Sequence, residues 1–491
     1  MLLVGKITCI PDPINNSSLI PSVASFLPRD DEHYHPPSSQ SKHNLDSFVL
    51  VGHAAKQRID MHPQSTFYHA KRFLGRQYHS STVQDLKQEV EFAVVPYSTE
   101  NAEGGVDPPF VDGGDSDAGV NFHVPTGFPL LESSTKSSSS NTVSKFRLRD
   151  PSGLKHYLSP ERVGSYVVKH LLHLASVYLG YDHITSAVIA VPAKFTPMQR
   201  AATARAFQMA GLKVTRVLEE PTAAALAYGL QHKSDVNFIL VYDFGGGTLD
   251  VSVLQVSKGY VEVMASEGDD TLGGADFDSA IAHYLLPEGD HKDRNNTLVM
   301  HTAHVTEMLE LLARMHYGRD NPVSHQDIIQ IEESFADHCA RTEQIPLCHG
   351  ASFHSLGEQL KIQLSTSDVA EVECLSLSEI DLKRISATAD TISSATNEVC
   401  HALFPTTLSM SLQQFHEAVS HLYERSLLPI RRVLKVLDLT TEDIDEVVMV
   451  GGTTRMPMIR ELVREELKVK SLNIDIDPDI TVAYGAASVI D

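Results

Sequence analysis

A glycine-rich segment with a carboxylate at each end has the residue types that suit phosphate chemistry. It runs from Asp243 to Asp250 and reads Asp-Phe-Gly-Gly-Gly-Thr-Leu-Asp, between two β-rich runs. Glycine has no Cβ, so its N–H can approach an anion closely, while Thr248 adds a hydroxyl donor and Asp243 can hold Mg²⁺ through water. The segment predicts a phosphate- and metal-binding hairpin; the alternative is a tight turn that needs glycine only for its geometry. The predicted tip comprises Gly245, Gly246, Gly247 and Thr248.

A second glycine pair lies where a predicted strand meets a predicted helix. Val450 ends the strand, and Gly451, Gly452, Thr453 and Arg455 follow. N–H groups and the helix dipole favour an anion or a ribose phosphate at such a junction, and Arg455 can stack on a base. Taken alone, the pair is better explained by the geometry of a strand-to-helix turn, for which glycine is often used. Together, the two glycine segments favour a nucleotide site.

Two further groups of polar residues are candidates for metal and nucleotide contacts. Glu220 precedes Pro221, which holds it extended at a helix start, where its carboxylate can reach the water shell of a metal. Glu358, Lys361 and Ser365 are spaced i, i+3, i+7, which places them within roughly 60° on one helix face. The alternatives are an ordinary acid at a helix start and a solvated helix face.

The elements that must position these residues alternate between helix and strand. Apolar residues at helical spacing predict a helix that begins at Pro160 and stops at Gly180, and Thr196 begins another as its N-cap. Residues 186–191 between them read as a buried strand. Further strands are predicted at 213–218, 237–242, 249–256 and 446–450, and further helices at 221–228, 302–315 and 458–468. The alternation predicts an α/β fold with two lobes.

The composition excludes several classes of protein. Asp and Glu number 63 against 40 Lys and Arg, and the net charge of −23 over 491 residues would repel nucleic acid. No apolar stretch approaches the roughly 18 residues of a membrane span. The first ten residues carry too short an apolar run for a secretory signal, which predicts a cytoplasmic protein. Five cysteines are an odd and sparse set, which argues against a disulfide framework.

Several segments together resemble the nucleotide-binding domain of the 70-kilodalton heat-shock chaperones. They occur in the family's order over nearly the whole chain, and within the family they look most like the microsomal stress-70 ATPase-core branch. The matching segments are Ala54-Ala55-Lys56, residues 70–76, Val191-Pro192-Ala193 with Gln199-Arg200, residues 220–229, residues 243–250, Leu272-Gly273-Gly274 with Asp276-Phe277-Asp278, Gly451-Gly452, and Asp477-Pro478-Asp479 with residues 483–487.

The resemblance implies an actin-like, ribonuclease H-like ATPase fold whose two lobes enclose Mg-ATP or Mg-ADP. Residues 1–228 would form lobe I, with a disordered insertion at about 97–145. Residues 229–445 would form lobe II, with an enlarged helical subdomain at about 280–370, and residues 446–491 would close the nucleotide cleft. The chain is expected to lack a peptide-binding domain.

The resemblance also implies a role for each candidate residue. Lys71 would orient the attacking water, and Glu220 and Asp243 would hold the waters of Mg²⁺. Thr248 would act with the hairpin glycines on the phosphates. The ribose and adenine would be contacted by Glu358, Lys361, Ser365, Gly452, Arg455 and Asp479. Gly451 and Thr453 would also belong to the nucleotide site.

Two departures from the family pattern matter for activity. The chain begins downstream of the family's first phosphate loop, so hydrolysis is expected to be impaired, and a preceding signal peptide would place the protein in the endoplasmic reticulum. Ile362 stands where the family usually has an arginine that sandwiches adenine, so base stacking is expected to be weaker.

These observations lead to one leading hypothesis and two alternatives. The leading hypothesis is a monomeric chaperone-type ATPase domain that works with J-domain co-chaperones and nucleotide-exchange factors. The first alternative is a catalytically impaired scaffold that binds nucleotide or docks co-chaperones. A sugar kinase of the same superfamily is disfavoured by the Glu220-Pro221-Thr222 and Ala70-Lys71-Arg72 matches.

Overall fold

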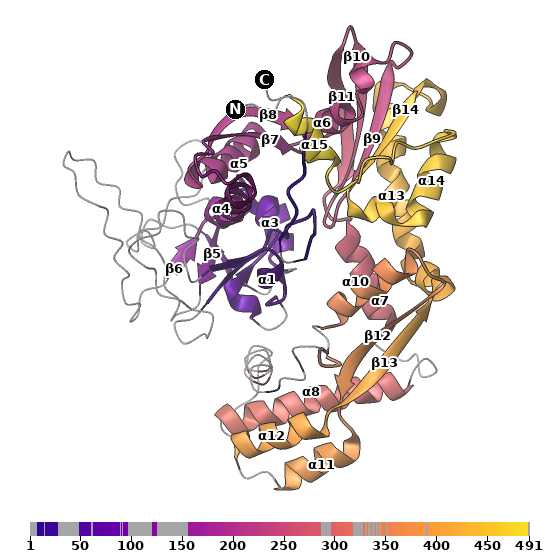
Figure 1. The fold of residues 1–491 in the computed structure, drawn as a ribbon. Coiled ribbons are helices and arrows are strands. Elements are labelled where there is room, and N and C mark those ends of the chain that lie inside the picture. The colour runs from indigo at the N-terminus through magenta and orange to yellow at the C-terminus, as the bar shows by residue number, and fades with distance from the viewer. Residues whose placement is uncertain are drawn as a thin grey trace, which may run out of the picture. The chain divides into compact units, whose positions relative to one another are not determined.

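The computed structural model divides into two compact units, which are described separately (Figure 1). Unit 1 comprises Met1–Leu230 and Asp479–Asp491, and unit 2 comprises Gln231–Pro478. Among the described residues, no helix is both long enough and apolar enough to cross a bilayer. The structure describes residues 7–13, 15–27, 49–59, 62–88, 90, 92–96, 120–124, 156–285, 296–317, 328, 331, 335, 339, 342, 345–349, 352–388 and 391–489.

The first part of unit 1 has an aromatic core. The ring of Phe26 packs edge to face against Phe67 and Tyr166, with centroids 5.6 Å apart in both pairs. Two three-stranded sheets, in the orders β2-β1-β3 and β4-β5-β6, accompany short helices. The elements are β1 (Ala24–Phe26), β2 (Val49–Val51), α1 (His53–Lys56), a 3₁₀ turn (Pro63–Ser65), β3 (Thr66–Phe67), α2 (Ala70–Phe73), α3 (Ser81–Leu86), β4 (Val94–Pro96), β5 (Val120–Val124), β6 (His156–Leu158) and α4 (Pro160–Leu179).

A strand lies inside the stretch that the sequence predicts to be a disordered insertion. β5 pairs antiparallel with both β4 and β6. Its sequence, Val-Asn-Phe-His-Val, has the two-residue alternation of a strand, which the Gly- and Ser-rich surroundings obscure. The prediction of irregular structure is therefore wrong for residues 120–124, and the remainder of 97–145 lies outside the described residues.

The second part of unit 1 follows the predicted order of elements, with one difference in burial. Thr196 and Gln199 form the capping box expected at the start of α5. β7 and β8 pair in parallel, but only Ile189 and Val191 of β7 are buried, because these two strands form a sheet without further partners among the described residues. The strand predicted at 186–191 is therefore confirmed, but the prediction that it is fully buried is wrong. The elements are β7 (Ser186–Val191), α5 (Pro197–Met209), β8 (Lys213–Glu219), α6 (Glu220–Ala227) and α15 (Thr481–Ala487).

The last helix of unit 1 packs closely on α6. A Cβ at Gly485 would lie 1.7 Å from the carbonyl oxygen of Ala223. Only glycine permits this approach, because any side chain would overlap the α6 backbone. α15 thereby fixes the helix that begins with Glu220.

Unit 2 is built on a four-stranded sheet in the order β11-β10-β9-β14. β9, β10 and β11 form an antiparallel meander, while β14 runs parallel to β9. The predicted hairpin is thus confirmed, and its core residues Tyr242 and Phe244 are fully buried. A 3₁₀ turn (Leu230–His232) begins at Leu230 of unit 1 and leads into unit 2. The sheet and the elements around it are β9 (Phe238–Phe244), β10 (Leu249–Ser257), β11 (Tyr260–Asp269), α7 (Gly274–Leu285), α10 (Ser352–Leu364), α13 (Leu412–Leu437), a 3₁₀ turn (Thr441–Asp443), β14 (Glu446–Val450), η6 (Gly452–Arg455) and α14 (Pro457–Leu467).

A second core within unit 2 forms between helices and a two-stranded sheet, and we call these elements the helical subdomain. Its buried residues include Leu309, Phe335, Leu377 and Val399. Its elements are α8 (Asn296–Tyr317), β12 (Val369–Ser376), α11 (Glu379–Thr388), α12 (Ile392–Ala402) and β13 (Phe404–Ser411). The helix predicted at 302–315 lies within α8.

Two disulfides occur in unit 2, contrary to the expectation from the cysteine count. Cys339 pairs with Cys400, and Cys348 pairs with Cys374. The odd count misled the prediction because one cysteine, Cys9, lies in unit 1 and takes no part in these two bonds. Disulfides are typical of oxidising compartments, so the inference of a reducing compartment loses its basis.

Candidate functional site

The predicted phosphate hairpin has a four-residue tip, residues 245–248, whose backbone N–H groups can donate to a ligand. Phe244 pairs with Leu249 as the last rung of the β9–β10 ladder, and the N–H of Gly245 donates to the carbonyl of Thr248 at 3.0 Å. Within the part of the chain that the structure describes, the N–H groups of Gly246 and Gly247 have no protein acceptor. An anion at the tip would satisfy these donors.

Two carboxylates stand side by side next to this tip. Asp243 and Asp250 are directly opposite each other in the β9–β10 register, so their side chains project from the same face of the sheet. Like charges in opposed positions destabilise a sheet unless a cation lies near them. Half-buried carboxylates that adjoin phosphate donors are suitable to hold Mg²⁺ through its water shell. Of these two carboxylates, the sequence predicted only Asp243 as a metal residue, together with Glu220 elsewhere in the chain; the register adds Asp250.

The start of α7 supports the tip from behind. The N–H of Gly274 donates to the carbonyl of Gly245 at 3.1 Å, and the N–H of Ala275 donates to Gly246 at 2.9 Å. A Cβ at Gly273 would lie 2.4 Å from backbone atoms of Gly246 and Gly247, so only glycine fits there. These bonds hold the tip carbonyls toward α7.

The second glycine pair lies against the first. Gly451 has φ +84°, and a Cβ there would lie 2.4 Å from the carbonyl oxygen of Phe244. The Thr453 hydroxyl donates to the carbonyl of Gly245 at 2.9 Å, and β14 places Val450 beside Asp243. The structure therefore brings the two predicted glycine segments together in one cradle, formed by residues 245–248, 272–275 and 451–453.

The predicted helix face on α10 also reaches this cradle. Lys361 forms a nearly buried ion pair with Asp278 at 2.7 Å and donates to the carbonyl of Gly274 at 3.0 Å. Lys361 thus ties α10 to α7, an attachment that the sequence did not indicate. Glu358 is half-buried one turn earlier, and Ser365, just past the helix end, donates through its hydroxyl to the Lys361 carbonyl at 3.0 Å.

The remaining predicted adenosine residues, Arg455 and Asp479, belong to different units. Arg455, at the end of η6, pairs with Asp477, and both are partly exposed. The carbonyl of Pro478 accepts from the N–H of Gly451 at 3.0 Å, which holds this segment beside the second glycine pair. Asp479 is the next residue and belongs to unit 1.

Unit 1 brings its two predicted catalytic residues together. The ammonium of Lys71, on α2, donates to Oε1 of Glu220 at 2.8 Å, and it lies 5.9 Å from the centre of the Phe195 ring. The side chain of Lys71 is 57% exposed and that of Glu220 is 16% exposed, so the lysine can reach solvent while the carboxylate is held. The pair joins residues that are 149 positions apart in the sequence.

Arg200 braces the neighbourhood of this pair. It bonds to Glu219, the N-cap of α6, at 2.9 Å and donates to the carbonyls of Ala193 and Phe195 at 2.8 and 2.9 Å. The guanidinium therefore links the start of α6 with the loop that carries Phe195. Sequence reasoning matched Arg200 to the family but assigned it no role.

Comparison with known proteins agrees with this architecture. The model of the family described as "Hsp70 protein" matches residues 37–107, 137–309 and 354–490, well over half of the chain. The chain belongs to the Hsp70 family. The fold of the chain is accordingly the actin-like nucleotide-binding domain of Hsp70, as the sequence predicted.

Individual Hsp70 relatives align over almost the entire chain. Heat shock 70 kDa protein 13 of Homo sapiens is 32% identical over 489 residues, which cover 98% of this chain and 83% of the relative. Chaperone protein DnaK of Prochlorococcus marinus is 35% identical over 440 residues, 89% of this chain. The alignment covers only 51% of that DnaK, so the chain spans about half of its length.

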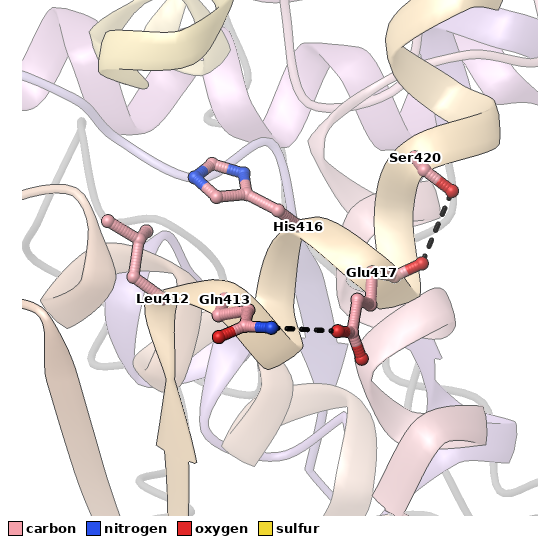
Figure 2. A pocket seen from close by; sticks show the side chains of 5 residues that line it. All are labelled: Leu412, Gln413, His416, Glu417 and Ser420. Carbon is pink, nitrogen blue, oxygen red and sulfur yellow. Dashed lines mark hydrogen bonds between the residues drawn. The ribbon is translucent and has the colours of Figure 1, made fainter.

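A surface depression on this Hsp70 chain lies at the start of α13 and contains none of the predicted site residues (Figure 2). Gln413 donates to the carboxylate of Glu417 at 3.2 Å, and Nδ1 of His416 lies 2.8 Å from the hydroxyl of Tyr423. Burial lowers the pKa of His416 and raises the pKa of Tyr423, so both groups stay neutral near pH 7. We assign these contacts a role in α13 structure. The depression is lined by Leu412, Gln413, His416, Glu417 and Ser420.

The histidine that precedes α2 predicts a pH dependence of stability in this Hsp70 domain. Burial, helped by the charge of Arg72, lowers the pKa of His69 from 6.5 to about 4. The unfolded chain therefore binds a proton that the folded chain excludes. The contribution of His69 to the free energy of unfolding is fully present above about pH 6.5 and is lost as the pH falls toward 4. The loss reaches about 3 kcal/mol at pH 4.

Urea unfolding followed by circular dichroism between pH 4.5 and 7.5 tests this. His69 has a left-handed backbone (φ 55°), so His69→Asn suits its geometry and should flatten the acid limb. His183→Asn, at an exposed histidine, is the matched control and should leave that limb unchanged. An acid limb that keeps its full slope in His69→Asn would show that His69 does not cause it.

Proposed function

We propose that the chain binds Mg-ATP and Mg-ADP and hydrolyses ATP slowly, as a chaperone-type ATPase domain. The observation that carries the proposal is the convergence of three glycine segments at one cradle, where Thr453 and the start of α7 fix the hairpin tip. Gly246, Gly247 and Thr248 donate to the phosphates. Glu358, Lys361, Ser365, Gly452, Arg455 and Asp479 serve the ribose and adenine.

We place the proposed Mg²⁺ site beside the cradle. Asp243 and Asp250 would hold Mg²⁺ through its waters, and the family resemblance assigns Glu220 to the waters of Mg²⁺ as well. When bound, Mg²⁺ neutralises charge on the phosphates. The donor set fits such an ion because opposed carboxylates gain stability from a nearby cation.

Hydrolysis depends on positioning the attacking water. The Lys71 ammonium orients the water oxygen toward the γ-phosphorus; the new P–O bond forms as the bond to the ADP oxygen breaks. Glu220 holds the lysine through their 2.8 Å hydrogen bond and assists removal of the proton from the water. Thr248 donates to the γ-phosphate.

The compartment and the partners follow from the same proposal. Two disulfides support an oxidising compartment of the secretory pathway over the cytoplasm. J-domain co-chaperones and nucleotide-exchange factors are the proposed partners of a monomer. The net charge of −23 disfavours nucleic acid.

A second candidate function is a scaffold that binds nucleotide weakly and does not turn it over. Ile362 favours it, since this side chain is 60% exposed on α10 at the position where the family usually has a base-stacking arginine. An aliphatic side chain offers no cation–π contact to adenine.

Calorimetry of ATP and ADP with and without Mg²⁺ tests binding, and single-turnover hydrolysis tests catalysis. We expect Mg-dependent binding, and Lys71→Ala should slow hydrolysis about 100-fold while ADP affinity changes less than about threefold. Lys194→Ala, at an exposed lysine of the neighbouring loop, is the control. Hydrolysis that survives in Lys71→Ala would refute the catalytic role; binding without hydrolysis in the unaltered chain would favour the scaffold, and no binding would refute the site.

A further inference from the structure

An arginine on α13 forms a dense cluster of hydrogen bonds next to the cradle. Arg425 donates through Nε and Nη2 to the two carboxylate oxygens of Asp269, at 2.7 and 2.9 Å. The same Nη2 donates to the hydroxyl of Thr271 at 2.6 Å and to its carbonyl at 3.2 Å. A bidentate guanidinium–carboxylate pair fixes both distance and orientation.

The partners of Arg425 reinforce one another. The N–H and hydroxyl of Thr271 both donate to Oδ1 of Asp269, at 3.0 and 2.9 Å. Burial alone would raise the pKa of Asp269, but hydrogen bonds from Arg425 and Thr271 lower it, so the carboxylate stays ionised. The ion pair is consequently present throughout the neutral pH range.

The segment held by Arg425 leads directly into the cradle. Asp269 ends β11 opposite Leu249, the residue that follows the hairpin tip. A short loop then leads to Gly274 at the start of α7, whose N–H bonds to the carbonyl of Gly245. Arg425 therefore fixes both the strand beside the tip and the loop behind it.

We infer that Arg425 is a positioning residue for the phosphate-binding tip, and that it acts through Asp269 and Thr271 without touching the nucleotide. The inference rests on the proposed function for its effect on affinity. When the bonds from Arg425 to Asp269 and Thr271 are lost, residues 270–275 can move. The carbonyls of Gly245 and Gly246 then lose the N–H groups of the α7 start as fixed donors. Phosphate binding then weakens most. Adenosine binding changes less, because Arg455 on η6 is held by Asp477, and Lys361 on α10 keeps its ion pair with Asp278 when its bond to this segment is lost.

Calorimetry with Mg-ADP and with adenosine distinguishes this role from a general loss of structure. Arg425→Met should weaken Mg-ADP binding about tenfold and change adenosine binding less than about threefold. Arg425→Lys should restore only part of the affinity because an ammonium cannot form the bidentate pair. Arg432→Met, at an exposed arginine on the same helix, is the matched control and should bind both ligands normally. Equal losses for both ligands, or no loss for either, would overturn the inference.

Hydrogen exchange without nucleotide separates this inference from the proposed function. In Arg425→Met, exchange at the amides of Gly245, Gly274 and Ala275 should accelerate about tenfold, while that in the middle of β9 stays unchanged. Unchanged exchange at the three amides would show that Arg425 does not position the tip. If the unaltered chain fails to bind Mg-ADP, the proposed function is refuted, and the exchange measurement still decides the role of Arg425.

Discussion

Reduction of the two disulfides should release four thiols and destabilise the helical subdomain. The bonds close loops of 61 residues (Cys339–Cys400) and 26 residues (Cys348–Cys374). In the chain-entropy model these closures contribute about 4 and about 3.5 kcal/mol. We therefore expect amide protection in α12 and β12 to fall by at least about 100-fold on reduction. Native-state hydrogen exchange on peptides from these elements measures this directly.

Paired serine substitutions assign the effect to each bond. Cys339→Ser with Cys400→Ser should loosen α12, because that bond ties α12 to Cys339, whose N–H donates to the carbonyl of the buried Phe335 at 3.0 Å. Cys348→Ser with Cys374→Ser should loosen the junction between Leu347 and β12, where the N–H of Cys348 also donates to the Leu375 carbonyl at 2.8 Å. Cys9→Ser is the control. If the count of reactive thiols does not rise by four when the denatured chain is reduced, the pairing is wrong.

Gly273→Ala should strongly weaken binding of Mg-ADP. The new methyl would lie 2.4 Å from backbone atoms of Gly246 and Gly247, so either the tip or the start of α7 must move. Overpacking of this kind costs about 1–3 kcal/mol, which corresponds to a loss of affinity of about 5- to 150-fold if the displacement falls on the tip. Calorimetry with Mg-ADP measures the loss, and circular dichroism verifies that the variant is folded.

The β10–β11 turn supplies the matched control for this substitution. Gly259 has φ +84°, and a Cβ at this position would meet no atom within 4 Å. Asparagine tolerates this backbone conformation, so Gly259→Asn should bind Mg-ADP as the unaltered chain does. A folded Gly273→Ala variant with unaltered affinity would show that the cradle does not depend on the close approach of α7.

Local sequence signals predicted the elements of the site well. Two β-rich runs on either side of three glycines predicted the β9–β10 hairpin, and Thr196 with Gln199 predicted the start of α5. Such features depend on residues within a few positions of each other, so their physics is contained in a short window. The helix face of Lys361 was also predicted, because helical spacing alone determines it.

Contacts between distant residues could not be read in the same way. Arg425 and Asp269 are 156 positions apart, and Lys361 and Asp278 meet only because α10 packs on α7. Neither pair has a local pattern that distinguishes it from a solvated charge. The prediction that the chain lacks disulfides was wrong for a related reason: a count of cysteines carries no information on which of them the fold brings together.

The path of the chain through the two units has a consequence for synthesis. α15 is made after unit 2, yet it packs on α6, which is made before unit 2. Unit 2 is continuous in sequence and can complete its contacts as soon as Pro478 has emerged. In unit 1, the face of α6 that contacts α15 stays uncovered until α15 has emerged. During translation, unit 2 can therefore complete its fold first, while unit 1 is still incomplete and prone to aggregation.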